Sequence, residues 1–80
     1  MGTNYYIHGS QEHVAKSSWQ GRGFRVIWAQ DPDVLDRRAL HDPELRFEDE
    51  YGNVFSYADF KRLVTCAQEH DTSLVGKEFF

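Results

Sequence analysis

The chain has one cysteine, two prolines and no long hydrophobic run. The single cysteine, Cys66, excludes an internal disulfide, and a chain without disulfides is typical of a reducing compartment. No apolar stretch approaches the roughly 18 residues of a membrane-spanning helix. The first residues also lack the basic and apolar regions of a secretory signal peptide, so we expect a cytoplasmic protein.

Motifs for catalysis, metal binding and cofactor binding are missing as well. The four histidines fit none of the spacings of zinc motifs, and Cys66 has no second cysteine nearby. The segment Lys16-Ser17-Ser18 is similar to the end of a phosphate-binding loop, but Ala15 stands where that loop needs glycine. Without a nucleophile and base, the sequence predicts no metal, no cofactor and no enzymatic activity.

Charge is distributed unevenly along the chain. The net charge is −4, but residues 29–60 hold nine acids against three arginines, which gives that segment −6. An acidic segment lacks the basic residues that bind phosphates, and it suits docking onto a basic protein surface. The plainer interpretation, an ordinary solvated face, stays open. The acids that we expect to face a partner are Asp42, Glu44, Glu48, Asp49 and Glu50.

The N-terminal part offers an alternative site of opposite character. Residues 1–28 carry a charge of +2 and include an aromatic side chain among their basic residues. Such a patch is suited to a phosphate group, a nucleic acid or an acidic protein surface. Its members are Lys16, Ser17, Trp19, Arg22 and Arg25.

The clearest local structure lies between residues 49 and 64. Gly52 and Asn53 accept positive φ angles, so residues 51–53 are predicted to form a hairpin turn. Ser56 followed by Asp59 is a capping-box arrangement with Asp in place of Glu. An apolar stripe follows at helical spacing, at Phe60, Leu63, Val64 and Ala67. The pattern predicts a helix from about residue 57 to 69 that packs on the core.

The rest of the chain reads mainly as short strands. Alternating or β-branched segments predict strands at 4–8, 13–18, 24–29, 45–49 and 54–55. A short helix is expected at 34–40, and the tail, with Phe79 and Phe80, is expected to pack back or to reach a second copy in a homodimer. Residues 1–80 therefore predict a single α+β domain: an antiparallel sheet of about 4–5 strands with one main helix, about 57–69, on one face.

Four short segments in order along the chain resemble a known family. They are residues 2–6, 13–18, 49–52 and 76–79. Small phage-encoded proteins of uncharacterised function open with the same Met-Gly-Thr-Asn-Tyr-Tyr and share these segments. The resemblance implies a phage origin and a shared fold, but no activity. Longer members have a cysteine-rich, zinc-ligand-like cluster where this chain has only residues 7–12, so the resemblance implies no metal site here.

Together these features predict a small phage protein that binds and blocks a host protein in the host cytoplasm. Host defence complexes that bind nucleic acid are basic, and an acidic protein can occupy their nucleic-acid channel. The leading hypothesis is therefore an anti-CRISPR-type inhibitor with no membrane partner. The alternative is a nucleic-acid or phosphate-binding protein that uses the basic N-terminal patch.

Overall fold

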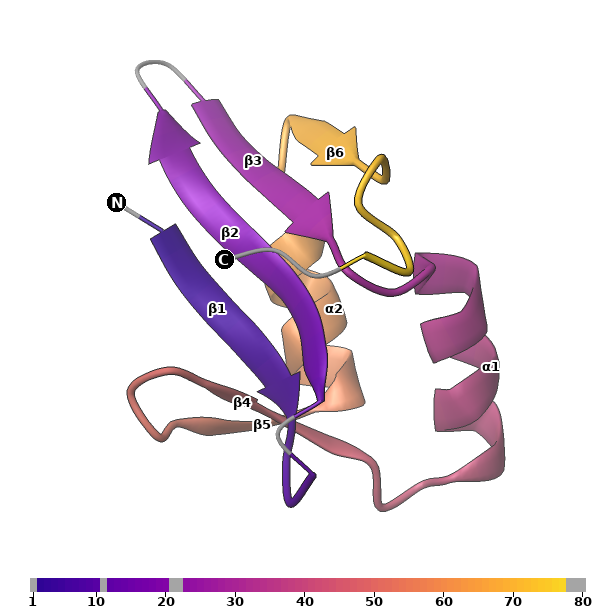
Figure 1. The fold of residues 1–80 in the computed structure, drawn as a ribbon. Helices are drawn as coiled ribbons and strands as arrows, with labels where there is room; N and C mark the ends of the chain where they lie inside the picture. Colours follow the sequence, from indigo (N-terminus) through magenta and orange to yellow (C-terminus); the bar gives the residue numbers. More distant parts are fainter. Residues whose placement is uncertain (1, 11, 21–22, 78–80) are drawn as a thin grey trace.

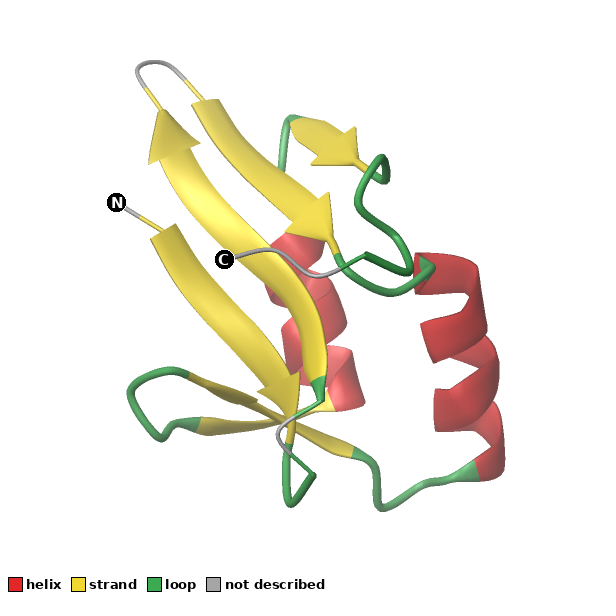
Figure 2. Ribbon diagram, viewed as in Figure 1, coloured by secondary structure: helices red, strands yellow, loops and turns green. Residues whose placement is uncertain are grey.

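The protein forms one mixed sheet with two helices. The computed structural model describes residues 2–10, 12–20 and 23–77. The sheet has six strands in the order β5-β4-β1-β2-β3-β6. Figures 1 and 2 show α2 lying across one face of the sheet and α1 beside it. The elements are β1 (Gly2–Ile7), β2 (His13–Gln20), β3 (Gly23–Trp28), α1 (Pro32–His41), β4 (Arg46–Asp49), β5 (Val54–Ser56), α2 (Tyr57–Thr65) and β6 (Glu69–Asp71).

The α+β class is confirmed, but the sheet differs from the prediction and the main helix matches it only roughly. The sheet has six strands, and it is mixed, because β6 pairs with β3 in parallel. The helix expected over 57–69 ends at Thr65, since the Gln68 amide donates to the Phe24 carbonyl at 2.8 Å and draws the chain onto the sheet edge. Helix α1, expected only as a short segment, has ten residues, so α2 is not the single main helix.

The α2 helix begins where the capping pattern places it. The Ser56 hydroxyl accepts a hydrogen bond from the Asp59 amide at 3.2 Å, which satisfies one of the free donors of the first turn. From there Phe60 and Val64 point into the core, with Leu63 and Ala67 packed at its margin.

Removal of this cap gives a first testable prediction. We expect Ser56→Ala to lower the free energy of unfolding by about 1 kcal/mol, because the Asp59 amide loses its acceptor. Urea denaturation of both proteins measures the difference. Ser56→Asp retains an acceptor and is the matched control; equal destabilisation by both substitutions would contradict the capping role.

The core is built mainly from aromatic rings. Phe60 stands at its centre, with ring centroids 4.4 Å from Phe47, 5.4 Å from Tyr5 and 6.2 Å from Trp28. Helix α1 contributes Leu35 to the same core. It is also tied to α2 by the Lys61 ammonium, which lies 2.9 Å from the Asp36 carboxylate.

A β-bulge in β2 determines which side chains lie on the face of the sheet that α2 does not cover. We call this face the open face. Tyr5 pairs with Ala15 while Tyr6 pairs with His13, so Val14 is an extra residue. Val14 and Ala15 are both buried, and alternation then continues with Ser17 buried. Because of this shift, His13 and Lys16 lie on the face that α2 does not cover.

The described part of the tail packs back through turns and forms no strand. Residues 72–77 form turns, with the Gly76 amide bonded to the Ala29 carbonyl at 2.9 Å and Val75 packed against the core. The expectations for Phe79 and Phe80 lie outside the described residues. Among the helices described, none is long and apolar enough to cross a membrane.

Candidate interaction surface

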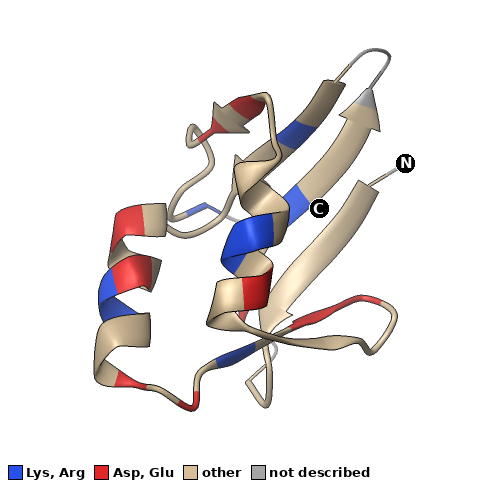
Figure 3. Cartoon of the chain, turned by 180° about the vertical axis from the view of Figure 1, so that it is seen from behind, with Lys and Arg blue, Asp and Glu red and all other residues tan. Residues whose placement is uncertain are grey.

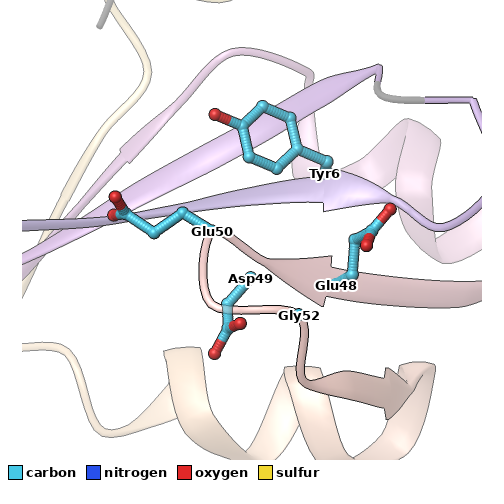
Figure 4. A pocket seen from close by; sticks show the side chains of 5 residues that line it. All are labelled: Tyr6, Glu48, Asp49, Glu50 and Gly52. Carbon is cyan, nitrogen blue, oxygen red and sulfur yellow. The ribbon is translucent and has the colours of Figure 1, made fainter.

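The open face of the sheet carries the candidate site. Strand alternation places Tyr6 of β1 and Glu48 of β4 on this face, and the two are directly paired in the antiparallel register. Glu50 follows in the turn after β4, and its side chain lines the same hollow as Tyr6 and Glu48. The side chains of Tyr6, Glu48 and Glu50 therefore gather at one end of the face, as Figure 4 shows.

A hollow of ≈ 460 Å³ lies at this position, lined by Tyr6, Glu48, Asp49, Glu50 and Gly52. The hairpin between β4 and β5 forms its outer wall. Gly52 makes that hairpin possible, since its φ of 89° is favourable only for glycine. We call the set Tyr6, Glu48 and Glu50 the acidic hollow.

One carboxylate of the acidic hollow, that of Glu50, is held by the neighbouring strand β1. The Asn4 amide donates to Glu50 Oε1 at 3.0 Å, and the Glu50 amide donates to the Asn4 carbonyl at 3.1 Å. Glu48 Oε1 lies 3.8 Å from His8 Nδ1, and its side chain is 26% exposed. Glu50 is therefore positioned before any partner arrives, which lowers the entropy that binding must overcome.

The assignment of Asp49 to the partner-facing acids is wrong. Its side chain points to the helix side of the sheet and the residue is 8% exposed. It accepts hydrogen bonds of 2.9 Å from the Tyr51 amide, the Asn53 amide and the Asn53 side chain. Burial acts to raise the pKa of the Asp49 carboxyl, but the donors of Asn53, Tyr51 and Gly52 outweigh it, so the pKa lies below its ordinary 3.8. Asp49 organises the hairpin.

The remaining two predicted acids lie in the connection between α1 and β4. Asp42 and Glu44 are both exposed, and Asp42 accepts a hydrogen bond from the Glu44 amide at 3.1 Å. Figure 3 shows acidic residues along this connection and on β4, with one basic residue on β4 itself. That residue is Arg46, whose guanidinium donates to the carbonyls of Pro43 and Leu45. Among the described residues it forms no ion pair with Asp42 or Glu44, although its positive charge offsets part of the negative charge of this connection.

The structure does not bring the alternative basic patch together. Lys16 and Arg25 lie on the open face, but Ser17 and Trp19 point to the opposite face, and Arg22 is outside the described residues. Arg25 is also neutralised, since its guanidinium lies 2.8 Å from the Asp71 carboxylate and 3.9 Å from that of Glu69.

Asp71, the nearer partner of Arg25, is itself held in the charged form. Hydrogen bonds from Ser73, with a smaller contribution from Arg25, hold the pKa of Asp71 at about 2. The Asp71 carboxylate is therefore ionised at neutral pH, and its negative charge offsets the positive charge of Arg25. A phosphate at this position would have to displace an internal ion pair.

Tyr6 is the member of the acidic hollow that sequence reasoning missed. Its signal was the pair Tyr5-Tyr6 within a strand, which must place one ring on each face of the sheet.

Metal binding has no support from the described residues, where no three His, Cys, Asp or Glu side chains gather. Cys66 is exposed and unpaired with sulfur. No protein-family model, curated protein or solved structure matches the chain.

Proposed function

We propose that the protein is a small inhibitor that binds a basic surface of a host defence complex, as an anti-CRISPR-type protein does. The observation that carries this proposal is the acidic hollow, where two carboxylates, one of them held by the Asn4 amide, flank an aromatic ring on the open face of the sheet. This geometry suits an arginine or lysine side chain from a protein partner.

The chemistry of such a contact is specific. A guanidinium stacks on an aromatic ring through cation–π attraction and donates hydrogen bonds to carboxylates at its edge. Glu48 on β4 and Glu50 in the turn that follows it lie on the two sides of the Tyr6 ring. A side chain inserted over Tyr6 would therefore meet a carboxylate on either side.

Asp42 and Glu44 add a negative electrostatic field that acts on a basic partner over a longer distance. Both are exposed and form no ion pair within the described part of the chain, so they raise the rate of encounter with a basic partner more than they strengthen the final contact. Nucleic-acid channels are lined with arginine and lysine to bind phosphates. A protein that presents carboxylates in place of phosphates can occupy such a channel, and the phage resemblance supplies a host protein as the target.

The test is capture of a partner from host lysate by the tagged protein at low and at moderate salt. We expect Glu48→Gln with Glu50→Gln to weaken the captured complex by about tenfold or more, since two charged contacts are lost. The matched control, Val34→Lys with Thr65→Lys, makes the same +2 change at exposed positions elsewhere. Its affinity should stay within about twofold of wild type, because the lost contacts are local.

Two results would overturn the proposal. One is a protein partner whose affinity falls equally in the control pair, which would reduce the effect to net charge. The other is recovery of nucleic acid alone, lost on Lys16→Ala with Arg25→Ala, which would transfer the function to the basic side chains.

A further inference from the structure

A second hollow lies on the opposite face of the sheet, where the helix layer stops. Helix α2 ends at Thr65, and the chain turns away to the edge of β3. The ends of β2 and β3 beyond that point are left without a helix over them. The hollow has a volume of ≈ 350 Å³, and its lining includes Tyr5, Ser17, Trp19, Phe24 and Leu63.

The walls of this hollow are aromatic and aliphatic. Trp19 is 72% exposed and lies against Phe24, with ring centroids 5.0 Å apart and an interplanar angle of 35°. Leu63 of α2 forms the facing wall. A tryptophan this exposed beside an apolar hollow offers a flat surface against which a second ring can stack.

The floor of the hollow is polar and deeply buried. Ser17 Oγ and Tyr5 Oη lie 3.3 Å apart in a hydrogen bond, and both residues are 5% exposed. Two hydroxyls carry two hydrogens and their mutual bond uses one, so one hydrogen remains to be donated. The described part of the chain gives this pair no further acceptor. Burial raises the pKa of the Tyr5 phenol, which therefore keeps its hydrogen at neutral pH.

We propose that this hollow binds a small planar apolar molecule that carries one hydrogen-bond acceptor. The ring would stack on Trp19 and Phe24, and its acceptor would take the remaining hydrogen of the Tyr5–Ser17 pair. The volume lies at the lower end of the range of small-molecule sites. Of the side chains enriched at protein interfaces, Phe, Trp and Arg have no acceptor for that hydrogen and Met has only a weak one, so, with Tyr as the exception, a small molecule fits the floor better than a partner's side chain.

The test compares acetophenone with ethylbenzene, which has a similar shape but no carbonyl. Titrations are followed by the indole N–H resonance of Trp19 in nitrogen-correlated NMR spectra. We expect saturable binding of acetophenone that is roughly tenfold tighter than that of ethylbenzene, which corresponds to one buried hydrogen bond. In Tyr5→Phe with Ser17→Ala, which removes both hydroxyls together, ethylbenzene should bind at least as tightly as acetophenone, because the carbonyl would be buried without a donor.

Tyr57→Phe, which removes a hydroxyl outside the hollow, is the control and should keep the preference for acetophenone. The proposal is overturned if neither probe saturates, if wild type binds both equally, or if the double variant keeps the preference. It is also overturned if the Trp19 resonance moves with protein concentration alone, because a second copy of the chain would then occupy the hollow.

Discussion

Phe60→Ala is expected to lower the free energy of unfolding by about 3–5 kcal/mol, as is typical for a buried Phe replaced by Ala. Phe60 is 1% exposed and its ring contacts those of Phe47, Tyr5 and Trp28. Its removal leaves a cavity at the junction of α2 and the sheet. A domain of 80 residues has a total stability of about 4–12 kcal/mol, so this single change removes a large part of it.

Thermal unfolding followed by circular dichroism measures this effect. The melting temperature should fall by more than about 12 °C, given the usual 4–8 °C for each kcal/mol in a domain of this size. Leu40→Ala, at an apolar position that is 83% exposed, is the control and should change stability by less than about 0.5 kcal/mol. A loss below about 1 kcal/mol for Phe60→Ala would show that the rings repack without it.

The parts of the fold that depend on local chemistry could be predicted from the sequence. The Ser56 cap, the Gly52 turn and the alternation in β3 each follow from residues within a few positions of one another. The parallel pairing of β6 with β3 could not, because Glu69, His70 and Asp71 are polar residues without a strand pattern. Their pairing depends on a free edge of β3, which is present only after β1, β2 and β3 have assembled.

The candidate site could be predicted in part, for a similar reason. Alternation correctly separates Glu48 and Glu50 from Asp49, but it does not say which face is buried. The buried face is the one on which α2 packs. This face holds Phe47, and Asp49, two residues further along β4, lies on it as well. The same geometry divides the predicted basic patch, because Ser17 and Trp19 lie on the helix side of the sheet and Lys16 and Arg25 lie on the open face. Charge counted along the chain ignores this division.

Asp49→Ala is expected to lower the free energy of unfolding by about 2–3 kcal/mol, because a carboxylate that accepts several N–H hydrogen bonds is lost from a buried position. The amides of Tyr51 and Asn53 and the Asn53 side chain lose their common acceptor, and the hairpin loosens. Glu48→Ala and Glu50→Ala are the controls on the same strand and should each cost less than about 1 kcal/mol. Urea denaturation at neutral pH measures all three, and equal losses would contradict the special role of Asp49.

The pH dependence of the free energy of unfolding shows whether the charge of the Asp49 carboxylate stabilises the fold. The pKa of Asp49 is lower in the folded protein than its ordinary 3.8, so its ionised form stabilises the fold at any pH above about 4. That contribution declines as the pH falls below 4 and is gone once the pH is below the folded pKa. The stability gap between wild type and Asp49→Asn should therefore be constant from pH 5 to 7 and should narrow on acidification. A gap that stays constant through pH 3 would mean that the loss comes from the acceptor oxygen that Asn lacks and not from the charge of Asp49. A narrowing gap would show that the charge of Asp49 belongs to the fold, which leaves Glu48 and Glu50 as the strand's carboxylates available to a partner.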